Sequence, residues 1–253
     1  MRPMRKIDVE LLSAAEEGRL AHAQTLLDCG ANPNAVYSDW TSALMLAAKH
    51  GHPNLVRLLL GRGAKCDRHE IETGKTALMM AVEGGHGTCV RLLIAAGSDV
   101  DRPDHFGSTP LMAAARVGRG TMLQDLIRAG TEVNTRMPNG FDALREAVLR
   151  RRRDAVKVLV EHGAQLDGRD RAGFTPLMHA AESGDPEIVR FLLANGADAT
   201  ARNLTGQTAA QIAYRKGNRE IHELIQSATA SQRQVGRGKQ RQNKSETRCS
   251  NAK

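Results

Sequence analysis

The most constraining feature of this 253-residue chain is a unit of 33 residues that recurs along most of its length. The strings STPLMAAARVG at 108–118 and FTPLMHAAESG at 174–184 are two copies of one segment. Their threonine position recurs at steps of 34, 33, 33, 33 and 33 residues, as Ser42, Thr76, Thr109, Asp142, Thr175 and Thr208. A period of about 20 to 50 residues is typical of repeat architectures, in which each copy is one supersecondary unit.

Two glycine series share this period. One runs through Gly18, Gly51, Gly85, Gly118, Gly184 and Gly217, and is interrupted only by Arg151. The other is uninterrupted and runs through Gly30, Gly63, Gly97, Gly130, Gly163 and Gly196. Independent series with one period predict about seven units, near 5–36, 37–70, 71–103, 104–136, 137–169, 170–202 and 203–227.

The unit at 175–200 shows what each copy forms. Thr175 followed by Pro176 is a helix N-cap with proline at the first helical position. Apolar residues at helical spacing follow, and Gly184 ends this short helix. Asp185-Pro186 begins a second helix, and a polar, hairpin-like loop leads to the next unit. One such unit cannot bury its own apolar face, so the units are expected to stack.

The pattern Gly-x-Thr-Pro-Leu-x-x-Ala-Ala-x-x-Gly, followed by Val/Ile-x-x-Leu-Leu-x-x-Gly-Ala, resembles the ankyrin repeat over roughly residues 5–227. The resemblance implies an all-α solenoid of stacked helix-turn-helix units with hairpin loops. One departure is regular: the family's His after the leucine is replaced by Met45, Met79, Met112, Met178 and, once, Arg145. The family's His ties neighbouring hairpins together by hydrogen bonds, and we expect packed thioethers in its place.

The formal charge of +8 is concentrated at one end of the chain. Seven of the 36 basic residues and one of the 28 acidic residues lie from Ala228 onward, which leaves 29 basic and 27 acidic residues before it. Residues 228–253 contain almost no large apolar side chains, so we predict a disordered basic tail. Such a tail can tether non-specific nucleic acid or an acidic partner, serve as an import signal, or only keep the chain soluble.

The sequence contains no pattern that is typical of an enzyme or a metal site. The four cysteines form no CxxC pair, and no phosphate loop, Gly-x-Ser-x-Gly elbow or His-Glu-x-x-His occurs. His52 and His86 each follow the glycine between the two helices of a unit. The resemblance implies that a residue at this position has a structural role. We therefore expect no catalytic activity, no cofactor and no metal. No stretch is long and apolar enough to span a membrane. We predict a cytoplasmic location for the protein, and entry into the nucleus is the alternative.

The resemblance implies that a partner protein lies against the concave side, formed by the hairpin tips and exposed positions of the first helices. In this register the tips are 37–41, 71–75, 104–108, 137–141, 170–174 and 203–207. Five of the seven aromatic residues fall in them: Tyr37, Trp40, Phe106, Phe141 and Phe174. Trp40 also replaces the tip glycine of its unit. We predict these aromatics, with Lys49, Arg116 and Arg150, as the contact set; alternatively, Phe141 and Phe174 only shield their own hairpins.

The fifth unit departs most from the pattern. Ala143 replaces the proline there, and Arg151-Arg152 replace the glycine and the residue after it, within the run Arg150 to Arg153. Together with Arg116 and Arg119 one unit earlier, these arginines predict a basic patch for an acidic partner or a phosphate group. A solvated helix-turn face is the alternative interpretation.

These observations predict a monomeric, non-catalytic scaffold or adaptor that binds another protein. The second hypothesis is a polyanion binder that uses the Arg150–Arg153 patch and the basic tail. A third is a solenoid that inhibits an enzyme by covering its active site, which the sequence does not distinguish from scaffolding.

Overall fold

The structure is a computed structural model that describes residues 4–232. These residues form two compact units that divide between Ala164 and Gln165, and each unit contains several of the 33-residue repeats. The first contains α1 (Lys6–Glu17), α2 (Leu20–Asp28), α3 (Ala43–Lys49), α4 (Pro53–Gly61), α5 (Ala77–Glu83), α6 (Gly87–Ala95), α7 (Pro110–Val117), α8 (Gly120–Arg128), α9 (Ala143–Leu149) and α10 (Arg153–Glu161). The second contains α11 (Pro176–Ser183), α12 (Pro186–Ala194), α13 (Ala209–Arg215) and the helical residues 219–232. Within residues 4–232 the only β-structure is two isolated bridges, Val36–Ser42 and His69–Thr76, so the predicted all-α class is confirmed.

The recurring threonine position is the N-cap of the first helix in each pair. Its side-chain oxygen accepts a hydrogen bond from the backbone N–H three residues later, which satisfies one of the free donors of the first turn. The distance is 2.9 Å at Asp142, 3.2 Å at Ser42 and 3.4 Å at Thr76, Thr109, Thr175 and Thr208. Aspartate and serine therefore replace threonine without loss of the cap.

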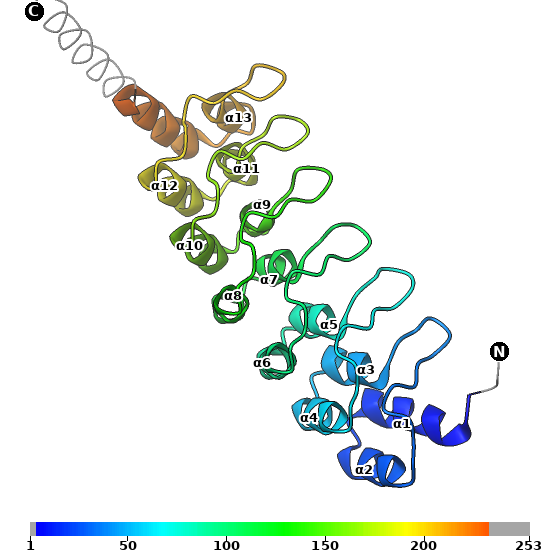
Figure 1. Ribbon diagram of the computed structural model, residues 1–253. Coiled ribbons are helices and arrows are strands. Elements are labelled where there is room, and N and C mark those ends of the chain that lie inside the picture. The colour runs from blue at the N-terminus through cyan, green and yellow to red at the C-terminus, as the bar shows by residue number, and fades with distance from the viewer. Residues whose placement is uncertain (1–3, 233–253) are drawn as a thin grey trace, which may run out of the picture. The chain divides into compact units, whose positions relative to one another are not determined.

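In the first unit, the helices form two rows (Figure 1). Helices α1, α3, α5, α7 and α9 pack in sequence against one another, and α2, α4, α6, α8 and α10 do the same behind them. The small side chains between the first-row helices, such as Ala47 and Ala114, are fully buried, as are leucines such as Leu11 and Leu78. Close approach at the alanines lets each helix pair cover the apolar face of the next.

The methionines that replace the family's histidine are buried, as the sequence predicted. Met45, Met79, Met112 and Met178 are almost inaccessible to solvent, and the Ser42 N–H lies 3.5 Å from the Met45 sulfur. Arg145 fills the same position in α9 and is also fully buried. It donates a hydrogen bond of 2.6 Å to the Gly140 carbonyl, and its guanidinium carbon lies 5.4 Å from the centre of the Phe141 ring.

The second unit extends further than the sequence suggested. Residues 228–232, which composition predicts as part of the disordered tail, continue the helix that starts at 219. The Gln232 side chain donates to the Ala197 carbonyl at 2.9 Å and accepts from the Ala199 N–H at 3.1 Å. The segment is thus held by an amide side chain rather than by apolar burial, which is why composition placed the boundary too early. The rest of the predicted tail, 233–253, lies outside the described residues.

Candidate protein-binding surface

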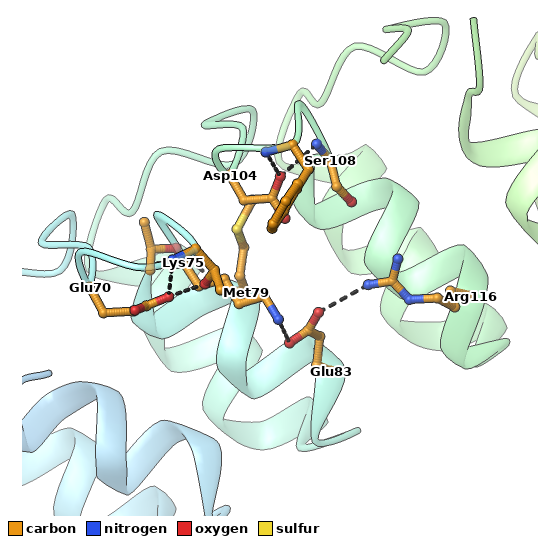
Figure 2. Close-up of polar contacts among 10 residues, drawn as sticks. Glu70, Lys75, Met79, Glu83, Asp104, Ser108 and Arg116 are labelled. Atoms are coloured by element: carbon orange, nitrogen blue, oxygen red, sulfur yellow. Dashed lines mark hydrogen bonds and ion pairs between the residues drawn. The ribbon is translucent and has the colours of Figure 1, made fainter. Parts of the chain in front are cut away.

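The hairpin loops of the first unit are held in shape by hydrogen bonds of their own. The backbone closes each loop, with Tyr37 N–H donating to Thr41 O at 3.0 Å and Asp104 N–H donating to Ser108 O at 2.9 Å. The Asp104 carboxylate also accepts from the N–H groups of Phe106, at 2.9 Å, and Ser108, at 2.8 Å (Figure 2). An aspartate that bonds the backbone two residues ahead stabilises a tight turn without help from the core.

The second hairpin tip is one residue longer than the others. Glu70, not residue 71, forms the closing pair, because its N–H donates to Lys75 O at 3.1 Å. This extra residue accounts for the single 34-residue step in the repeat. The Glu70 carboxylate accepts from Glu72 N–H at 3.0 Å, from Thr73 N–H at 2.8 Å and from the Thr73 hydroxyl (Figure 2). Burial acts to raise the pKa of Glu70, but these hydrogen bonds outweigh it and hold the pKa below the usual value for glutamate.

The first three tips are joined to one another by backbone hydrogen bonds. Ile71 N–H donates to Asp39 O at 2.9 Å, and His105 N–H donates to Thr73 O at 2.8 Å. At the equivalent position of the fourth tip the chain has Pro138, which has no N–H to donate. We call residues 37–41, 70–75 and 104–108 the tip row.

Each tip of the tip row exposes one large apolar side chain. Trp40 is 51% exposed, Ile71 is 51% exposed and Phe106 is 62% exposed. Trp40 also has a φ of +68°, where the next two tips have Gly74 and Gly107. The structure therefore brings two of the predicted aromatic contacts, Trp40 and Phe106, to one linked surface.

The other predicted aromatics, Tyr37, Phe141 and Phe174, are half-buried, and the two phenylalanine rings contact side chains of their own repeats. Phe141 lies against the Arg145 guanidinium, as described above. The Phe174 ring centre is 5.1 Å from that of His179, whose Nε2 is 2.8 Å from Asp170 Oδ2. Burial, followed by the nearby negative charges of Glu16 and Asp39, raises the pKa of Tyr37. For Phe141 and Phe174 these contacts fit the alternative interpretation, in which the rings shield their own hairpins.

The predicted basic contacts differ in how much of their charge is available. Arg116 lies 3.0 Å from a Glu83 carboxylate oxygen, and Lys75 lies 2.8 Å from the other (Figure 2). Glu83 therefore offsets part of the positive charge of both. Lys49, the last residue of α3, and Arg150, which follows α9, are exposed.

In three inter-helix turns of the first unit, the residue after the left-handed position reaches back to the preceding repeat. Nε2 of His52 lies 3.1 Å from Glu16 O, and Nε2 of His86 lies 3.0 Å from Lys49 O. Arg152 Nε donates to Arg116 O at 3.1 Å in the same way. This position is a structural link between repeats, which agrees with the structural role expected for the two histidines and adds Arg152 to it.

Three of the exposed apolar residues outside the predicted contact set are close to the tips or in the last helix pair, and they were missed because only aromatic tip residues were predicted. Ile71 belongs to the tip row, Leu204 is in the last tip, and Tyr214 is in α13. A search for any large apolar residue between the closing pair of a tip finds Ile71 and Leu204. Tyr214 has another signal, because it stands where earlier units have a small or β-branched residue, such as Ala181.

The part of the chain that the structure describes offers few other side chains that could form a metal or catalytic site. Residues 4–232 contain no group of three or more potential metal ligands. Burial raises the pKa of the Cys89 thiol, so this group stays protonated at neutral pH. Over the same residues, every helix is too short or too polar to cross a bilayer.

Comparison with known proteins agrees with this architecture. The sequence model of the family described as ankyrin repeats (3 copies) matches residues 11–104, 44–137, 87–170, 111–203 and 166–235, so the chain belongs to the ankyrin repeat family. Among solved structures, the chain is similar to the human ASB11 ankyrin repeat domain. The two share 28% sequence identity with a TM-score of 0.78, over 86% of this chain and 96% of that one. No curated protein sequence matches the chain. Ankyrin repeats are generally protein–protein interaction modules.

Proposed function

We propose that this protein is a monomeric, non-catalytic adaptor that binds a segment of a partner protein along the tip row. Trp40 and Phe106 are the main apolar anchors, and Ile71 adds a third contact between them. Exposed Lys49, the last residue of α3, supplies positive charge for the same partner. Tyr37, Phe141 and Phe174 act indirectly, by holding their hairpins in shape.

The observation that carries the proposal is the conformation of Trp40. A non-glycine residue in the left-handed region costs about 1 to 2 kcal/mol, and glycine at this position would avoid the cost. Burial does not offset the cost, because about half of the indole stays in contact with solvent. Backbone strain that serves no packing role is a feature of binding sites. Tryptophan is also among the residues most often found at the centre of protein interfaces.

The tip row is suited to binding because its backbone is already ordered. Each tip has closing hydrogen bonds, and two further bonds fix the spacing between neighbouring tips. A partner therefore loses little free energy in ordering this surface, and most of the gain from burying the three side chains contributes to affinity.

Affinity purification with the full chain tests the proposal. We expect a partner that is retained at raised salt and lost when Trp40→Ala and Phe106→Ala are combined. The matched control combines Leu149→Ala and Tyr214→Ala, which removes two exposed apolar side chains elsewhere. Deletion of residues 233–253 tests the competing hypothesis of a polyanion binder. Capture that survives the double tip variant but disappears with the deletion or with salt would show a polyanion binder instead.

A further inference from the structure

The turn between α9 and α10 differs from the other inter-helix turns of the first unit in its charge. We define the arginine turn as Arg150–Arg153 together with Arg119, which occupies the corresponding turn between α7 and α8. All five side chains are exposed. Arg119, Arg150 and Arg151 form no ion pair or side-chain hydrogen bond with any residue from 4 to 232. We propose that the arginine turn binds a carboxylate-rich segment of a partner protein. This surface is separate from the tip row, and the proposal does not depend on binding at the tip row.

The other repeats of the same chain show what this turn needs for folding. Gly51 and Gly85 supply the left-handed residue there, with φ of +73° and +74°. His52 and His86 supply the link to the preceding repeat. In the arginine turn, Arg151 adopts the left-handed conformation at +54° and Arg152 makes the link. Since glycine and histidine are sufficient for both tasks, the positive charges are additional to what the fold requires.

Two of the arginines are held in place before any ligand arrives. The Arg152 side chain lies directly against Gly118, where an added Cβ would collide with it, while its Nε bonds the Arg116 carbonyl. Arg119 lies over Gly85 in the same way, with its guanidinium carbon 3.2 Å from the position of an added Cβ. A long side chain that is already ordered loses less conformational entropy when it binds an anion.

The surrounding residues favour an acidic polypeptide over nucleic acid. None of the residues in the arginine turn is aromatic, so it offers no ring on which a base can stack. Asp154 is exposed in the first turn of α10 and Glu146 is half-buried in α9, so negative charges limit the length of continuous positive surface, which suits a short acidic segment better than a long polyanion. The planar guanidinium groups bind carboxylates with paired hydrogen bonds.

Fluorescence anisotropy with the full chain and a labelled peptide of six consecutive glutamates tests the inference. The control peptide has six glutamines. We expect the combined variant Arg150→Gln and Arg151→Gly to weaken binding of the glutamate peptide about tenfold at low salt, because two charge-assisted contacts are lost. Arg151→Gly keeps the turn geometry of the other repeats, and circular dichroism checks that the fold is retained.

Two matched controls remove the same charge from other places. One is Arg57→Gln with Lys65→Gln, both exposed in the first unit, and the other is Arg237→Gln with Lys239→Gln. Each should change affinity less than twofold. Equal losses in all three double variants would overturn the proposal, since binding would then follow net charge alone. Tighter binding of a ten-nucleotide single-stranded DNA than of the glutamate peptide would also overturn it, as would no preference over the glutamine peptide.

Discussion

At the scale of single residues, two side chains occupy backbone conformations that the repeat otherwise reserves for glycine. Trp40 and Arg151 are the non-glycine residues with positive φ in the described part of the chain. Each is exposed, and each lies on a different proposed binding surface. The corresponding residues of the other repeats are glycines. The other repeats therefore show that glycine is sufficient for folding at these two positions.

Substitution by glycine should therefore stabilise the fold. We expect Trp40→Gly and Arg151→Gly each to raise the free energy of unfolding by about 0.5 to 1 kcal/mol. The gain is the relief of left-handed strain, reduced by the greater freedom of glycine in the unfolded chain. Urea denaturation measures it. Gly130→Ala is a control in which strain is introduced, because Gly130 has a φ of +94° with open space around it. This variant should lower the free energy of unfolding by about 1 kcal/mol. A loss of stability in both glycine variants would contradict the strain argument.

At the scale of elements, two tips of the tip row are stabilised by acidic side chains rather than by apolar burial. Asp104 and Glu70 each accept hydrogen bonds from the backbone of their own loop, and neighbouring tips share further bonds. The hydrogen bonds of the Glu70 loop depend on the ionised state of its carboxylate, whose pKa they lower. That loop should therefore respond to acid before the helices do.

The tip that contains Glu70 should loosen as the pH falls. Its folded pKa lies below the unfolded value of about 4.3, so its contribution to stability is present above pH 4.3 and is lost as the pH falls through the folded pKa. Trp40 is the single tryptophan, and the adjacent Asp39 accepts a hydrogen bond from Ile71. We expect a change in Trp40 fluorescence in this acidic range. Glu70→Gln should remove the part of the change that comes from Glu70; an identical titration in the variant would refute the assignment.

At the scale of the whole molecule, the repeat period predicted most of the fold but few of the contacts between repeats. The N-caps, the helix pairs and the left-handed turns follow from residues within one unit, and all of them were readable from threonine and glycine spacing. Contacts such as Arg152 with Arg116, or Arg145 with Phe141, depend on the direction of side chains and on the approach of a neighbouring unit. Ile71 was missed for a different reason, since it lay within the predicted tip 71–75 but only aromatic tip residues were predicted as apolar contacts.

Because each repeat contacts only its neighbours, the effect of a core cavity should depend on its place in the stack. Leu78 in α5 and Leu12 in α1 are both fully buried. Replacing either by alanine should cost about 2 to 5 kcal/mol locally. We expect Leu12→Ala to expose α1 and α2 to hydrogen exchange while α5 and α7 stay protected. Leu78→Ala should weaken protection on both sides of α5. Equal loss across all the first-unit helices in both variants would show a single cooperative core instead.

Pro138 has a consequence for how the surface can respond to a ligand. The loops before it are bonded in series, so pulling on Trp40 strains the peptide groups that lead to His105. The loop that contains Pro138 lacks the N–H that would continue this series. Displacement of one early loop should therefore be transmitted by backbone hydrogen bonds as far as residue 108, whereas the next loop would receive it through the packing of the Pro138 ring against Gly107.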